Sequence, residues 1–136
     1  MNSKKFILAA LAAFAVLFVL NSLWFGVIFK DWLANQMPEM HENIPLHVFA
    51  ELVFAVLLAI IYPLGYKGGS PASEGLKFGL LMGLVYQLPN AIHMYASMGG
   101  SPAVPCMFIV NGILVGIAAG ITIGLVYGNK GTSTQV

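Results

Sequence analysis

The sequence predicts an all-α integral membrane protein, a bundle of four transmembrane helices. The first observation is composition, because 59% of the 136 residues are hydrophobic and only 8% are charged, whereas about one quarter of an ordinary soluble domain is charged. The second is a set of four apolar runs, at about residues 6–29, 46–66, 75–98 and 103–127. Each is long enough to cross roughly 30 Å of hydrocarbon as a helix. Helices are required there because the backbone finds no water to bond.

Three segments separate the runs. Residues 67–71 and 99–102 are short and rich in Gly, Ser and Pro, as turns are, and a longer polar segment covers about residues 30–45. The first run follows two lysines, as a secretory signal does, but it is too long for the apolar part of a signal, so we expect it to be retained. The single Cys106 excludes an internal disulfide. We therefore expect one four-span domain over residues 1–136.

Lysines predict the orientation. If the four runs alternate in direction, only Lys30 lies on the side opposite the N-terminus; the other five lysines lie on the N-terminal side, namely Lys4, Lys5, Lys67, Lys77 and Lys130. Cytoplasmic loops carry the excess of Lys and Arg. Both termini are therefore predicted in the cytoplasm of a bacterium, with the chain in the inner membrane and segment 30–45 outside.

Glycine spacing predicts how two of the helices pack. The last run carries a glycine at every fourth position, and the third run does the same over its first half. Small residues in register let transmembrane helices approach closely, and the short link at 99–102 makes these two runs antiparallel neighbours. We expect the two rows to meet; they are Gly112, Gly116, Gly120, Gly124 and Gly128, and Gly75, Gly79 and Gly83.

Polar residues within the runs predict a site in the outer half of the bundle. His47 and Glu51 are four residues apart and share one helix face, and polar groups at matching depths on the other runs are expected to converge on them, because unpaired polar groups are costly in hydrocarbon. The candidate ligand-binding residues are Glu51, His93, His47, Asn90, Asn21 and Asn111. The alternative is that the asparagines, and Gln87 beside them, only form hydrogen bonds between helices.

Potential metal ligands gather in the stretch "MPEMHENIPLH" at residues 37–47 and on the helices beside it. Imidazole, thioether and thiol groups favour copper, whereas two histidines and a glutamate suit zinc or iron. Two histidines on neighbouring helices also suit a haem-like macrocycle. The candidate metal ligands are His47, Glu51, His93, His41 and Met40. The alternative is that Met serves here as a flexible apolar filler.

The end of the first run reads "LWFGVIFKDW", from Leu23 to Trp32. It resembles the Trp-aromatic-small…Phe…Trp signature of an uncharacterised bacterial domain-of-unknown-function family of small four-span inner-membrane proteins. The family usually has Pro where Val27 stands here. The resemblance implies the four-span layout and carries no activity.

Three functions remain open at this point. The first is an integral membrane binding protein that holds a small ligand, a metal ion or a metallocofactor in the outer half of the bundle. The second is a small proton-coupled transporter with Glu51 as the titrating group, and the third is an accessory subunit of a larger membrane complex. The expected partners are the lipid bilayer and either further copies of the chain or a larger complex, with no nucleic acid. An enzyme is not expected, because no catalytic triad, Cys-His pair or phosphate loop is present.

Overall fold

The computed structural model describes residues 2–128, and within them all regular structure is helical. The elements are α1 (Ser3–Leu23), a π-helical segment η1 (Trp24–Ile28), the short α2 (Lys30–Gln36), α3 (Ile44–Gly65), α4 (Pro71–Met98) and α5 (Ala103–Tyr127). The four long helices lie within a few residues of the predicted runs. The segment at 30–45 was predicted to be a loop, and its first half instead forms α2, because Leu33 is buried against neighbouring apolar side chains.

Three parts of the chain are long and apolar enough to cross a membrane: residues 3–28, which join α1 and η1, then α3 and α5. They indicate a membrane protein. Helix α4 is longer but falls outside this set because its second half carries Gln87, Asn90 and His93.

Local signals explain where the helices begin and end. The side chain of Asn2 accepts a hydrogen bond from the first turn of α1, and Asn43 and Ser70 do the same for α3 and α4. Such caps satisfy N–H groups that have no partner within the helix. Helix α4 ends at Gly99 with φ 64° and α5 at Gly128 with φ 66°, a conformation that glycine adopts without steric cost.

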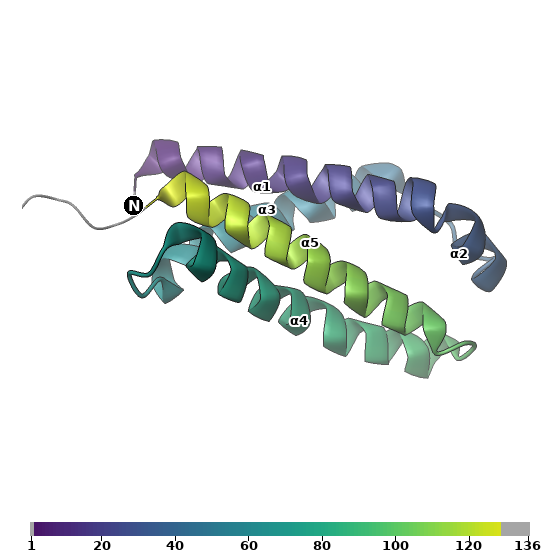
Figure 1. Cartoon of the computed structure of the whole chain (residues 1–136). Coiled ribbons are helices and arrows are strands. Elements are labelled where there is room, and N and C mark those ends of the chain that lie inside the picture. The colour runs from purple at the N-terminus through teal and green to yellow at the C-terminus, as the bar shows by residue number, and fades with distance from the viewer. Residues whose placement is uncertain (1, 129–136) are drawn as a thin grey trace, which may run out of the picture.

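Helices α4 and α5 run side by side (Figure 1) and approach so closely that no side chain fits between them at the glycines. A Cβ atom on Gly79 would lie 2.8 Å from the carbonyl carbon of Gly116 and 2.9 Å from the Cα atom of Ile117. The rows face each other in antiparallel order: Gly75 against Gly120, Gly79 against Gly116, and Gly83 against Gly112. This seam holds two helix backbones in direct contact.

The main apolar core lies among α1, α3 and α5, and it combines small and large side chains. Ala9, Ala13 and Ala59 are fully buried, which lets the helices come close, while Leu17 and Leu58 fill the remaining space. Helix α3 packs mainly on α1 and only weakly on α4. The bundle is therefore tight along α4 and α5 and looser between α3 and α4.

A proline in α3 is accommodated by a tyrosine from α5. Pro63 has no N–H to donate to the carbonyl of Ala59, four residues earlier in the helix. The hydroxyl of Tyr127 donates a hydrogen bond of 2.7 Å to that carbonyl, and the contact is buried. Tyr127 thus satisfies the backbone acceptor that Pro63 leaves without a helix donor, and it ties α5 to α3.

Candidate functional site

A cavity of about 500 Å³ opens among the helices, in the half of the bundle distant from the first turn of α1. Its walls come from the second half of α1, from η1 and α2, from the first halves of α3 and α5, and from the middle of α4. The weak contact between α3 and α4 leaves this space open, while the glycine seam fixes its opposite wall. The cavity lies where the chain places its polar residues.

A chain of hydrogen bonds crosses the cavity wall. Asn111 donates from Nδ2 to Oδ1 of Asn21 at 3.0 Å, and Asn21 donates from its own Nδ2 to Oε1 of Glu51 at 2.8 Å. The three side chains come from α5, α1 and α3, so the network connects three helices. It places a half-buried carboxyl group in the cavity wall with one hydrogen bond to hold its orientation.

Two polar atoms in the cavity wall have no hydrogen-bond partner among the described residues. They are Nε2 of Gln87 and Oδ1 of Asn111, and each of these side chains is only 6% exposed. Gln87 is held in place by its stem, because a Cβ atom on Gly112 would lie 2.5 Å from the Cβ atom of Gln87. Each of the two atoms has less than 1 Å² of accessible surface, so a donor and an acceptor lie buried within the cavity wall without a partner among the described residues.

Aromatic rings form much of the remaining surface. Phe54 of α3 stacks on Tyr86 of α4 with ring centroids 4.8 Å apart, and Phe25 of η1 lies 5.2 Å from Phe108 of α5. The π-helical turn contributes Phe25 and Gly26 to the wall. Single π-helical turns occur frequently at functional sites.

The tryptophans of the first run close the end of the bundle beside the cavity. Trp24 stacks near Phe29 at 4.7 Å and donates from Nε1 to the sulfur of Met107 at 2.9 Å. Trp32 meets Phe29 edge to face at 5.9 Å. The motif therefore forms a packed end to the cavity, and its tryptophans do not line the space.

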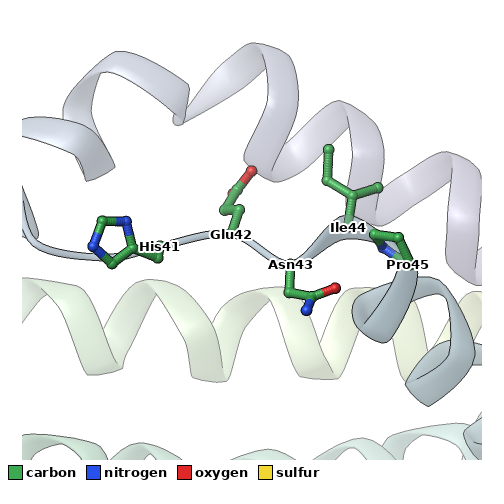
Figure 2. A pocket seen from close by; sticks show the side chains of 5 residues that line it. All are labelled: His41, Glu42, Asn43, Ile44 and Pro45. Carbon is green, nitrogen blue, oxygen red and sulfur yellow. The ribbon is translucent and has the colours of Figure 1, made fainter.

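A shallow hollow beside the loop is lined by residues 41–45 (Figure 2). In this view Glu42 and Ile44 point to one side of the chain and Asn43 to the other. Glu42 and Ile44 also line the cavity, whereas His41 lines only the hollow. The loop thus contributes the carboxylate of Glu42 to the cavity wall, whereas His41 lies outside the cavity.

The structure brings most of the candidate ligand-binding residues to one place. Five of the six line the cavity: Asn21, His47, Glu51, Asn90 and Asn111. His93 does not line it and is exposed on α4. Counting about 100° per residue, His93 lies at the edge of the polar sector, about 120° from Gln87, and Gln87 is the residue that faces the cavity.

The candidate metal ligands do not gather into one centre. Met40, His47 and Glu51 line the cavity, but His41 and His93 do not. Within residues 2–128, no three side chains of His, Cys, Asp or Glu are placed to share a metal ion. His47 and His93 also do not face a common space, as axial ligands of a macrocycle would. Spacing along the chain predicted this group, and the directions of the side chains separate it.

Sequence reasoning missed two groups of cavity residues. Gln87 was interpreted only as a residue for hydrogen bonds between helices, although its polar side chain within an apolar run was the available signal. The aromatic residues gave no signal, because aromatic side chains in a membrane span face lipid as readily as a cavity; they are Phe18, Phe25, Phe54, Tyr86 and Phe108.

Comparison with known proteins adds no relative: no family model, curated protein or solved structure matches the chain.

Proposed function

We propose that the chain crosses a bacterial inner membrane four times, with α4 as the additional span and both termini in the cytoplasm. With 28 residues, α4 is about 42 Å long at roughly 1.5 Å per residue. Two of its polar side chains, Gln87 and Asn90, line the cavity, so an interior site accounts for its lower hydropathy. This layout agrees with the family that the first-helix motif resembles.

Charge supports the same orientation. Lys5 donates from Nζ to the carbonyl of Tyr127 at 2.8 Å, so the start of α1 and the end of α5 lie at one end of the bundle, where Figure 1 also places the turn between α3 and α4. Lys67 lies in that turn and Lys77 in the second turn of α4, while Lys30 begins α2 at the other end. Lys130 lies outside the described residues. A reporter active only in the cytoplasm, fused to the C-terminus, should be active; activity of an export-only reporter there would reverse the orientation.

In this membrane the protein is a binding protein that holds a small organic molecule in the cavity. The observation that carries this proposal is the cavity with Glu51 in its wall, where one carboxyl oxygen accepts no hydrogen bond within residues 2–128. Leaving one buried polar group unsatisfied costs about 1–3 kcal/mol. A molecule with a hydrogen-bond donor would satisfy this oxygen, and a cavity of about 500 Å³ lies within the usual size range of ligand pockets.

An organic ligand is favoured over a metal ion or a metallocofactor by the donor set. The cavity offers amide and carboxyl groups from Asn21, Glu51, Gln87, Asn90 and Asn111 among aromatic rings, with His47 as its one imidazole. Metal centres for copper, zinc or iron are built from several imidazole, thiolate or carboxylate ligands that converge on one point.

The test is recovery of the ligand from purified protein. Protein from bacterial membranes is purified in mild detergent and extracted with organic solvent, and the extract is analysed by mass spectrometry. Gly26→Leu adds a side chain in the cavity wall. Gly65→Leu is the matched control, because Gly65 does not line the cavity and a Cβ atom at either of these two glycines would meet nothing within 4 Å.

We expect one molecule in stoichiometric amount from the parent and from Gly65→Leu, and a much smaller amount from Gly26→Leu. The same profile from all three proteins would contradict a ligand in this cavity.

Proton-coupled transport is the second candidate, and Glu51 favours it. Its carboxyl group lies within a candidate span, lines the cavity and ends the hydrogen-bond chain through Asn21. Intramembrane carboxyl groups commonly serve proton relays. In proteoliposomes that contain the recovered ligand, Glu51→Gln should abolish the part of the flux that depends on a pH gradient, and Glu39→Gln, in the exposed loop, should not. A flux unaffected by Glu51→Gln would exclude this mechanism.

A further inference from the structure

The cavity wall carries more acidic than basic groups. Glu42 and Glu51 line it and no lysine does. In the described part of the chain, the ion pair formed within 4.0 Å joins Lys77 to Glu74 at 3.6 Å, so neither cavity carboxyl group has a cationic partner at that distance. A carboxylate at membrane depth needs a cation or a proton. Among residues 2–128, His47 is the only basic side chain in the cavity wall and interacts with Glu51 electrostatically, but it lies beyond ion-pair distance, so a cationic ligand would supply the close partner.

Hydrogen-bond acceptors predominate around Glu51. One of its oxygens accepts from Asn21, and the other accepts no hydrogen bond within residues 2–128. Oδ1 of Asn111 is also unpartnered, and Asn111 is joined to Glu51 through Asn21 by bonds of 3.0 and 2.8 Å. Oδ1 of Asn111 has less than 1 Å² of accessible surface, so the second oxygen of Glu51 is the acceptor that a ligand in the cavity can reach. An ammonium group can donate to this oxygen and also neutralise its charge, whereas a hydroxyl group can only donate and a carboxylate has no donor.

Aromatic side chains line the same cavity as Glu51. The stacked pair of Phe54 and Tyr86 and the pair of Phe25 and Phe108 line the same cavity from four different elements. Aromatic rings attract cations through their faces and bury apolar groups equally well. The walls thus suit a molecule with a positive end and an apolar body.

We propose that the ligand is an amphipathic amine, bound as its cation with the ammonium group on Glu51 and its apolar body against the aromatic side chains of the cavity wall. The inference rests on the proposed binding function and names the class of its ligand. The ammonium group can belong to a free amine or to the ethanolamine headgroup of a lipid, and the experiment distinguishes these sources.

The experiment compares three probes of one shape and different charge: phenylbutylamine, phenylbutanol and phenylbutyrate. Each is titrated calorimetrically at neutral pH into the protein in phosphatidylcholine nanodiscs, and empty discs are subtracted. We expect saturable binding of the amine, and affinities at least about tenfold lower for the alcohol and the carboxylate, because a charged hydrogen bond is lost.

Variants locate the site. Glu51→Gln removes the charge but keeps an oxygen that can accept from Asn21, and it should lower the affinity for the amine about tenfold or more without changing that for the alcohol. Glu39→Gln, outside the cavity, should change neither. If the natural ligand is a lipid headgroup, adding phosphatidylethanolamine to the discs should weaken amine binding. If the natural ligand is a free amine, amine binding should stay unchanged. Both results agree with an ammonium ligand.

Two results would overturn the cation preference. If the alcohol binds as tightly as the amine and Glu51→Gln changes neither, the cavity binds a neutral molecule and the binding function stands without its charged ligand. If none of the three probes binds above empty discs, the amine class is wrong, and the extraction experiment with Gly26→Leu decides the binding function independently.

Discussion

Replacing Gly79 by alanine tests the contact between α4 and α5 that fixes one wall of the cavity. The new Cβ atom would lie 2.8 Å from the carbonyl carbon of Gly116 and 2.9 Å from Cα of Ile117, and ordinary contact begins at 3.4 Å. The carbonyl oxygen of Gly116 would lie closer still, so these atoms must retreat by about an ångström. They belong to the backbone of α5, so the helix moves as a whole. Overpacking of this kind costs about 1–3 kcal/mol, against a gain of roughly 1 kcal/mol in helix propensity.

Gly26→Ala is the control, because it makes the same substitution within a helical segment at a glycine whose Cβ atom would meet nothing within 4 Å. Unfolding of both variants by SDS in mixed micelles, followed by circular dichroism, gives the two free energies of unfolding. We expect Gly79→Ala to be less stable than Gly26→Ala by about 1–3 kcal/mol. If Gly79→Ala is equally stable or more stable, the two backbones are not in contact, and the account of the seam is wrong.

Two further predictions use the same unfolding assay. Gln87→Met removes a buried donor without a partner and keeps the length of the side chain, so the free energy of unfolding of the ligand-free protein should rise by about 1–3 kcal/mol. The control, Gln36→Met at the exposed end of α2, should change it little. A lower free energy of unfolding in Gln87→Met would show that the amide is satisfied. Tyr127→Phe should lose about 1–3 kcal/mol because it leaves a buried carbonyl unsatisfied. In a Pro63→Ala background Tyr127→Phe should cost less, because the helix regains its own N–H donor to the carbonyl of Ala59. An equal cost in both backgrounds would show that Tyr127 does not compensate for Pro63.

Much of the candidate site follows from depth along the predicted helices. Asn21, Glu51 and Asn111 are far apart in sequence but lie at similar depths, and polar groups in hydrocarbon are driven to pair; the structure joins them by two hydrogen bonds. The helical period did not predict whether His93 faces the cavity. It shares a broad sector with Gln87, and only packing against α5 determines which edge of that sector faces the cavity.

By itself the sequence determined the helical class and the approximate ends of the long helices, because hydropathy and caps act over a few neighbouring residues. Spacing predicted six residues of the glycine seam, but it also included Gly124, which faces Pro71, and Gly128, which lies beyond the end of α5. Tertiary structure alone decided three things: α2 within the polar segment, the π-helical turn at Gly26, and the weak contact of α3 with α4 that leaves the cavity open. The same holds for the bond from Tyr127 to the carbonyl released by Pro63. Each depends on side chains distant in the chain meeting at one place, and local patterns carry no information about how tightly non-neighbouring helices pack.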